Sequence, residues 1–148
     1  MNLTIKDNRN LFNHLNFDLQ ALYNKSTSIY RVNLLIKDEI VSYAEFKFEN
    51  FPTRHLNLLN IETLELYQNK KYATAVIMIV EYIAYINKTQ NIEALFNPKN
   101  YFAEIFFKNK GYVVYSDGLH QYVTKTVDNN YISEIIIPNL TNFSIDNV

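Results

Sequence analysis

The stretch that decides the fold is Leu58–Tyr112, which reads LLNIETLELYQNKKYATAVIMIVEYIAYINKTQNIEALFNPKNYFAEIFFKNKGY. An apolar segment passes through the polar turn Gln68–Lys71 into the long apolar run Ala73–Ile86. This order predicts a buried strand, a turn and a core helix, then a short strand and a second helix that Gly111 ends. The first N–H groups of a helix have no acceptor within it and can bind an anion. We therefore expect a phosphate-binding site where the first strand leads into its helix.

Composition places the chain among folded globular proteins. Its 148 residues can form one domain with a core, and a hydrophobic fraction of 48% excludes a disordered chain. The formal net charge of -1, without any block of like charges, argues against a nucleic-acid partner. The chain has no cysteine, so disulfides, thiolate catalysis and cysteine-based zinc sites are excluded.

The sequence favours a cytoplasmic protein without a membrane or metal partner. The polar amino terminus, MNLTIKDNRN, lacks the apolar core of a signal peptide. The run Ala73–Ile86 contains Glu81 and is shorter than the ~20 residues that cross a bilayer, so it predicts a core helix. The histidines His14, His55 and His120 show no metal-ligand spacing, so no metal site is predicted.

The first half of the chain is expected to contain three strands and one helix. Leu3–Lys6 is a candidate strand, and Asp7 or Asn8 can cap a helix after it. The apolar runs Ile29–Ile36 and Ile40–Phe48 predict a hairpin. The helix is predicted because leucines recur at helical spacing, at positions Leu11, Leu15, Leu19 and Leu22.

The second half predicts two helices between strands. The strand Leu56–Leu66 precedes the turn, and the core helix after the turn runs to about Asn87. Ile92–Phe96 is the next strand. Asn97 then caps the second helix, with Pro98 at its first position, where the missing N–H has no cost. The last predicted elements are the two strands of a hairpin, Tyr112–Tyr115 and Gln121–Lys125.

The predicted order of elements is β-α-β-β-β-α-β-α-β-β. Hairpins and crossovers together favour a mixed α/β or α+β sheet layered with helices. Residues 1–126 are expected to form a single domain. Residues 127–148 are expected to form a C-terminal extension, in which Ile132–Ile137 can add a strand before a loose tail.

Two segments resemble motifs of the GNAT N-acetyltransferase family. Gln68–Ala73 is similar to the loop Arg/Gln-x-x-Gly-x-Gly/Ala, and Asn100–Tyr112 resembles Asn-x-x-Ala-x-x-Leu-Tyr-x-x-x-Gly-Phe. The second motif is the more specific, because its Asn, Ala, Gly and aromatic pair fall in register. The resemblance covers nearly the whole chain. It implies an α/β (α+β) fold with a mixed, mostly antiparallel central sheet of six to seven strands, flanked by helices on both faces.

The resemblance also implies acetyl-CoA as cosubstrate. In this family the strand before the loop diverges from its neighbour, and the gap takes the pantetheine arm. The backbone of Glu65, Leu66 and Tyr67 would bind that arm. The side chains of Asn100, Ala103 and Phe107 would border it. The diphosphate would lie among the residues of the helix start, which are Gln68, Lys70, Lys71, Tyr72, Ala73 and Thr74.

The implied reaction is direct transfer to an amine, which requires a group that takes a proton. Glu62, on the strand that leads to the loop, is the candidate base, and Glu45 on the hairpin is a weaker one. The alternative interpretation of Glu62 is a solvated or ion-paired residue of the sheet. The amine would approach from the side of the sheet opposite the cofactor, near the first helix and the first hairpin.

Two departures from the family pattern bear on activity. Lys71 replaces the first loop glycine; it can crowd the diphosphate or attract it as a point charge. Phe107 aligns with the tyrosine that acts as acid in the family, and it has no O–H to donate. Tyr101 is the candidate replacement, with Tyr67 and Tyr112 as others, although each can be a packing residue.

Three hypotheses follow from the sequence. The first is an acetyl-CoA-dependent N-acetyltransferase that acts on a small-molecule or peptide amine. The second is a catalytically degenerate GNAT-like module that serves in binding or regulation, as Lys71 and Phe107 suggest. The third is an interaction protein that forms a homodimer through pairing or exchange of Ile132–Ile137. We favour the first hypothesis.

Overall fold

The computed structural model describes residues 2–4, 6–7, 16–51, 53–96, 101–117, 119–127, 135–136 and 146–147, and the side chains of 17–51, 53–96, 102–117 and 119–127. The helices are α1 (Tyr72–Ile86), α2 (Tyr101–Asn109) and the short 3-10 helix η1 (Glu65–Tyr67). The strands are β1 (Asn2–Thr4), β2 (Lys6–Asp7), β3 (Asn16–Asn24), β4 (Ile29–Ile36), β5 (Glu39–Glu49), β6 (His55–Thr63), β7 (Asn91–Phe96), β8 (Val113–Ser116), β9 (Gln121–Thr126), β10 (Ile135–Ile136) and β11 (Asp146–Asn147).

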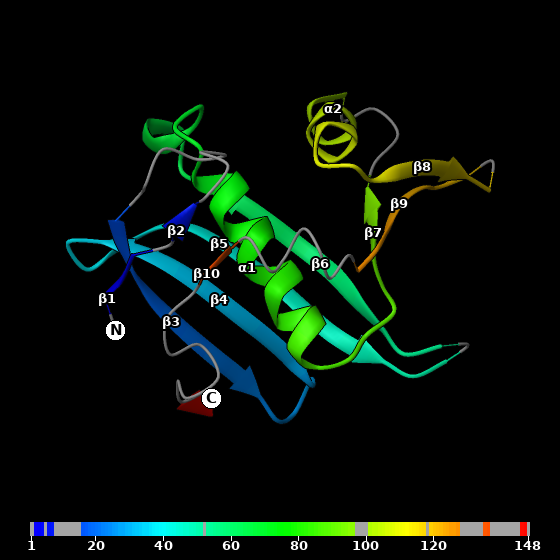
Figure 1. Ribbon diagram of the computed structural model, residues 1–148, viewed down its shortest axis with the longest axis horizontal. Coiled ribbons are helices and arrows are strands. Elements are labelled where there is room, and N and C mark those ends of the chain that lie inside the picture. Colours follow the sequence, from blue (N-terminus) through cyan, green and yellow to red (C-terminus); the bar gives the residue numbers. More distant parts are fainter. Residues whose placement is uncertain are drawn as a thin grey trace.

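One sheet organises the described residues. Its strand order is β1-β3-β4-β5-β6-β7-β9-β8, with β11 beside β3, and β10 pairs separately with β2 (Figure 1). Seven of its strands are four residues or longer, and all neighbours are antiparallel except β6–β7 and β11–β3. The predicted fold class, a mixed and mostly antiparallel sheet with flanking helices, is confirmed.

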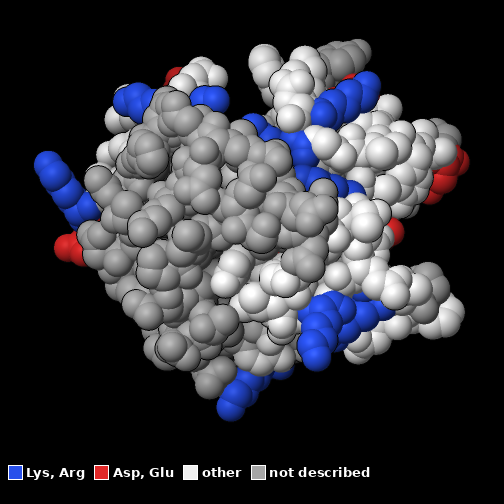
Figure 2. Space-filling view, viewed as in Figure 1, with Lys and Arg blue, Asp and Glu red and all other residues white. Residues whose placement is uncertain are grey.

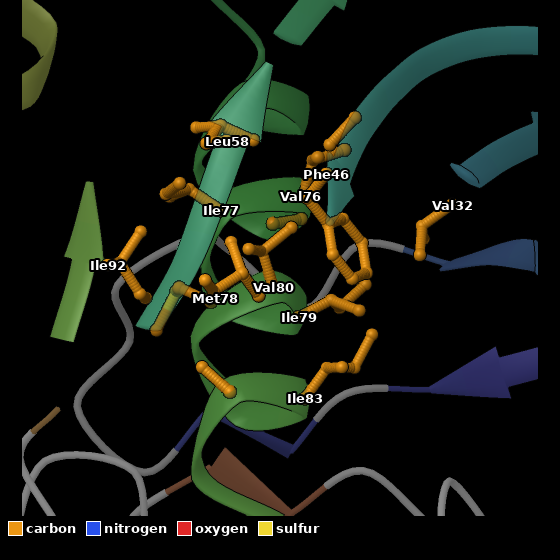
Figure 3. Close-up of a cluster of buried hydrophobic side chains, with 14 of the residues drawn as sticks. Val32, Phe46, Leu58, Val76, Ile77, Met78, Ile79, Val80, Ile83 and Ile92 are labelled. Carbon is orange, nitrogen blue, oxygen red and sulfur yellow. The ribbon is translucent and has the colours of Figure 1, made fainter. Parts of the chain in front are cut away.

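The core lies between α1 and the middle of the sheet. α1 crosses β5 and β6 (Figure 1) and contacts β7 as well. Phe46 of β5, Leu58 of β6 and Ile92 of β7 point toward the helix (Figure 3). Every residue of Thr74–Glu81 is buried, which explains why this helix is apolar on all sides rather than along one stripe. The predicted core helix is confirmed.

Residues 16–24 correct one prediction. They form β3 rather than the end of a helix, and Asp7 lies in β2 rather than at a helix cap. Phe17, Leu19 and Ala21 are buried and alternate with partly exposed residues, which is the period of a strand. Leucines four residues apart fit both periods, whereas Leu22, three residues after Leu19, falls on the opposite face of β3; pairing with β4 decides between helix and strand. The remainder of that predicted helix lies outside the described residues.

The other predicted elements agree with the structure. β4 and β5 form the expected hairpin, whose turn residues Lys37 and Asp38 have φ of 49° and 67°, as in a type I′ turn. β7, α2 and the β8–β9 hairpin lie where the sequence predicts them.

The cap residues Asn97 and Pro98 fall outside the described residues. The described part of Ile132–Ile137 is β10, which pairs with β2 of the same chain. None of the helices in the described ranges is long and apolar enough to cross a membrane.

Candidate active site

β6 and β7 pair at one end and then diverge. Their parallel pairing joins His55–Leu58 to Asn91–Ala94, whereas β6 continues to Thr63. The pairing of β5 with β6 shifts register at this point, because Glu45 lies opposite Asn60 and Phe46 lies opposite Leu58. Leu59 is therefore an extra residue, a β-bulge that bends β6 away from β7 (Figure 1). Among the described residues, no strand pairs with β6 on its β7 side from Leu59 to Thr63. This is the strand divergence that the resemblance implies.

The start of α1 lies beyond the end of β6. Lys71 precedes the helix in the left-handed conformation, with φ of 73°, and Asn69 also has a positive φ of 61°. The first hydrogen bond of the helix runs from the Ala75 amide to the Lys71 carbonyl over 3.0 Å, and no side chain caps the helix. The amides of the first turn therefore have no acceptor within the helix. The loop keeps the backbone of a glycine-type loop, and the side chain of Lys71 is exposed.

Positive charge collects between the start of α1 and the end of α2. Burial lowers the pKa of Lys110, and the charges of Lys71 and Lys125 lower it further, against the opposite effect of Glu81. Basic side chains gather beside α2 on this face of the molecule (Figure 2). A lysine pKa lowered by other lysines indicates a site of positive potential, where an anion would be stabilised.

A buried ion pair joins α1 to the end of α2. The side chain of Glu81 is 4% exposed and that of Lys125 is 14% exposed. The ammonium of Lys125 lies 3.0 Å from Oε1 of Glu81 and donates to the carbonyl of Lys110 over 2.9 Å. The hydroxyl of Tyr112 donates to the same carboxylate oxygen over 3.0 Å. Burial raises the pKa of Glu81, while Lys125 and Tyr112 oppose that shift. This cluster joins the body of α1 to β9 and to the end of α2.

The candidate base lies on the opposite face of the sheet. Glu62 is exposed on β6, and its Oε2 accepts a hydrogen bond of 2.6 Å from the hydroxyl of Tyr43 on β5. Asn60 donates to the same hydroxyl over 3.1 Å. The guanidinium of Arg31 lies 3.8 Å from the centre of the Tyr43 ring. Glu62 therefore belongs to a polar cluster beside the diverging part of β6, and it forms no ion pair with a described residue.

The residues expected to bind pantetheine by their backbone do not lie on a strand. β6 ends at Thr63, and Glu65, Leu66 and Tyr67 form η1, in which the amide of Tyr67 donates to the carbonyl of Leu64 over 2.8 Å. This corrects the predicted strand Leu56–Leu66. The backbone edge with no partner strand among the described residues belongs to Leu59–Thr63, which was not predicted to bind the cofactor; within it, the carbonyl of Thr63 accepts from the Gln68 side chain over 3.2 Å. The sequence gives only a weak signal for this edge of β6, because no residue type marks a β-bulge.

Phe107 is a core residue rather than a border of the gap. It is 3% exposed, and its ring packs edge-on against Phe106 and Tyr112. The amide of Tyr112 donates to the carbonyl of Phe107 over 3.0 Å, and the amide of Gly111 donates to that of Lys108 over 3.1 Å. This is a Schellman motif, which brings Phe107 and Tyr112 together around Gly111 at φ of 87°.

The remaining predicted residues lie around the gap or outside the described part. Gln68 donates from its side chain to the carbonyl of Thr63, and Tyr67 packs edge-on against Tyr72. Lys70 is exposed, with its ammonium 5.7 Å from the Tyr67 ring. Ala73 and Thr74 belong to the first turn of α1, and Ala103 packs against the core. Asn100 lies outside the described residues, as does the side chain of Tyr101, whose backbone begins α2. The described side chains contain no cluster that could hold a metal ion.

No protein-family model matches this chain. No curated protein matches it either.

Solved structures, in contrast, share its fold. An acetyltransferase of the GNAT family from Staphylococcus aureus Mu50 is similar with a TM-score of 0.62 and 12% identity, over 70% of this chain and 70% of that chain. PaiA N-acetyltransferase from Thermoplasma acidophilum, in complex with coenzyme A, has a TM-score of 0.61 and 17% identity, over 67% of this chain and 61% of that chain. A GNAT family acetyltransferase from Elizabethkingia anophelis with acetyl-CoA bound has a TM-score of 0.59 and 12% identity, over 68% of this chain and 78% of that chain. The chain therefore has the fold of the GNAT acetyltransferases, as its two motifs predicted.

Proposed function

We propose that this protein is an N-acetyltransferase that uses acetyl-CoA and transfers the acetyl group directly to an amine. One observation carries the proposal: β6 diverges from β7 at the Leu59 bulge and ends beside a helix start with unpaired amides and two nearby lysines. An unpaired strand edge can bind an amide-containing arm, and a helix start can bind its phosphates. The fold shared with acetyl-CoA-bound and CoA-bound proteins supports the same assignment.

The described residues fit the two ends of such a cosubstrate. The gap-facing backbone between Leu59 and Thr63 would pair with the pantetheine amides, except for the carbonyl of Thr63, which already accepts from the Gln68 side chain. The amides of Tyr72, Ala73 and Thr74 would face the diphosphate, with Lys71 and Lys110 as point charges beside it. When bound, acetyl-CoA would supply the acetyl group as a thioester. The exposed carboxylate of Glu62 would take the proton of the amine, from the face of the sheet opposite α1.

Calorimetric titration with acetyl-CoA tests the binding half of this proposal. We expect saturable binding by the unmodified protein, and an affinity about fivefold lower for Lys71→Gln, because two unit charges ~4 Å apart in water interact by about 1 kcal/mol. Lys88→Gln is the matched control: it removes another exposed lysine with positive φ, just after the opposite end of α1. Absence of binding at millimolar acetyl-CoA would overturn the proposal.

Release of the CoA thiol in the presence of an amine panel tests the transfer half. The chain has no cysteine, so a thiol reagent reports only the product. We expect release that depends on both the amine and Glu62.

The burial of Phe107 favours one alternative, a module that binds acyl-CoA without catalysis. A tyrosine hydroxyl is absent at this position, and the Phe107 ring is enclosed by Phe106 and Tyr112. Binding of acetyl-CoA without thiol release, across free amines and peptides, would establish this alternative and contradict transfer.

A further inference from the structure

A row of polar side chains crosses four strands and ends at Glu62. It begins at Gln20 on β3, whose side-chain oxygen accepts a hydrogen bond of 2.9 Å from Asn33 on β4. Asn33 accepts a hydrogen bond of 2.8 Å from Nε of Arg31, also on β4. The guanidinium of Arg31 covers the ring of Tyr43 on β5, whose hydroxyl bonds to Glu62 on β6. By strand alternation these side chains lie on the face opposite the buried Ala44 and Phe46.

The row is fixed at its inner end. Asn33 is 1% exposed, and a buried amide is costly unless its hydrogen bonds are made. Its side chain is held from both sides, by Gln20 and by Arg31. Arg31 is restrained further by the carboxylate of Glu45, 3.9 Å from its NH1. Arg31 is therefore a fixed surface on which the ring of Tyr43 rests, rather than a mobile surface cation.

The outer end of the row places a carboxylate oxygen. The 2.6 Å contact between the Tyr43 hydroxyl and Oε2 of Glu62 is in the range of a hydrogen bond to a charged acceptor. That hydrogen bond is the main reason why the pKa of Tyr43 is raised, since it favours the protonated hydroxyl. Asn60, next to the bulge, donates to the same hydroxyl, so the Tyr43 oxygen has a defined position. With Oε2 engaged, Oε1 is the atom of Glu62 suited to accept a proton.

We propose that Tyr43 is the positioning residue of the base Glu62 and that Arg31 holds Tyr43 for this purpose. This inference rests on the proposed function. In the step concerned, the amine nitrogen forms the C–N bond, the C–S bond breaks, and the amine proton passes to Oε1 of Glu62. The departing sulfur keeps the electron pair of the C–S bond and is protonated by solvent. Without the tyrosine hydroxyl, an exposed glutamate samples several rotamers, and few of them point Oε1 at the amine.

Turnover of three variants tests the positioning role. We expect Tyr43→Phe to lower kcat about 10-fold to 100-fold, as small displacements of a catalytic group can do, with unchanged affinity for acetyl-CoA. Glu62→Gln should lower kcat by about 10²-fold to 10⁴-fold. The double variant should be no slower than Glu62→Gln alone, because Tyr43 acts only through Glu62. Tyr115→Phe, at an exposed tyrosine of β8, is the control and should not change kcat.

A second measurement does not depend on turnover. In ¹³C-tyrosine spectra, Glu62→Gln should bring the pKa of Tyr43 back toward its ordinary value, because the charged acceptor is lost, while Glu45→Gln should change it less. An unchanged Tyr43 pKa in Glu62→Gln would overturn the inference. Additive losses of kcat in the double variant would also overturn the inference about Tyr43. They would leave the proposed function intact. Binding of acetyl-CoA without turnover by the unmodified protein would instead overturn both.

Discussion

Among the helix ends that place a residue in the left-handed conformation, the start of α1 and the end of α2 solve the same backbone problem with different residues. Before α1 the residue is Lys71, with φ of 73°; after α2 it is Gly111, with φ of 87°. A Cβ built on Gly111 would meet Cε of Lys125 at 3.7 Å, an ordinary contact, so the glycine is required by the backbone angle rather than by space. Lys71 adopts a similar angle with a side chain, at a cost of roughly 1–2 kcal/mol.

The two helix ends also differ in which features of the family motifs they share. The loop before α1 matches the family motif poorly by residue type, yet Asn69 and Lys71 adopt the left-handed angles that glycine favours, and the first amides of α1 have no acceptor within the helix. The end of α2 matches its motif well, yet Phe107 has no hydroxyl and is buried in a Schellman motif. In this chain, therefore, the segment that matches its family motif better by residue type, the end of α2, is also the one that lacks the motif's hydroxyl. Four substitutions can test this comparison, and they follow from the largest expected effect to the smallest.

Glu81→Ala would break the link between the body of α1 and the end of α2. It should lower the free energy of unfolding by about 3–5 kcal/mol, because Lys125 and the hydroxyl of Tyr112 lose a shared buried acceptor. Denaturant unfolding followed by circular dichroism measures this. The double variant Glu81→Met/Lys125→Met should recover most of the loss, since no buried charge then lacks a partner. A loss below ~1 kcal/mol for the single variant would show that the ion pair does not hold α1 and the end of α2 together.

Gly111→Ala isolates the backbone requirement at the end of α2. We expect a loss of about 1–2 kcal/mol, because alanine in the left-handed conformation is strained while its Cβ meets no close atom. Thermal unfolding would show a lower Tm. A neutral effect would mean that Tyr112 and Phe107 can pack without the left-handed residue.

Lys71→Gly makes the reverse exchange at the start of α1. It should raise the free energy of unfolding by up to about 1 kcal/mol through relief of strain, offset partly by the greater entropy of glycine in the unfolded chain. The same denaturant measurement applies. Lys25→Gly is the control, since Lys25 is exposed in a turn without a positive φ and should give no gain. Equal changes in the free energy of unfolding for Lys71→Gly and Lys25→Gly would show that the backbone of Lys71 is not strained.

Lys110 provides the most sensitive test of the basic site. Its pKa is lowered by burial and then by Lys71, so an anionic cosubstrate nearby should raise it. At a pH between the pKa of Lys110 in the free protein and its pKa in the complex, binding of acetyl-CoA should therefore take up a fraction of a proton. The affinity should fall as pH rises through that range. Calorimetry in buffers of different ionisation enthalpy measures the uptake. Lys110→Arg keeps the charge and should remove the uptake; an uptake that persists would assign it to another group.

Locally encoded elements were predicted well from the sequence. The apolar run of α1, the hairpin of β4 and β5, and Gly111 after α2 each carry their own signal, because periodicity and turn residues act within a few positions. Phe107 shows the limit of a motif match. Its spacing to Gly111 and Tyr112 is also the pattern of a helix end, which explains its burial without any reference to a substrate.

The missed features depend on partners distant in the sequence. Residues 16–24 are a strand because they pair with β4, although their leucine spacing alone fits a helix. The bulge at Leu59 exists only relative to β5 and β7. The contact of Tyr43 with Glu62 joins residues 19 positions apart, which no local pattern reveals.

The sequence by itself determined that this chain folds around one apolar helix laid on a mixed sheet, with a GNAT-type loop at the start of that helix. The tertiary structure alone decided where the two central strands diverge and that Tyr43 donates a hydrogen bond to Glu62. The physical reason is the range of the forces involved. Helix periodicity and turn conformation are set by neighbours along the chain, whereas strand register, bulges and polar rows are set by which strands come to lie side by side.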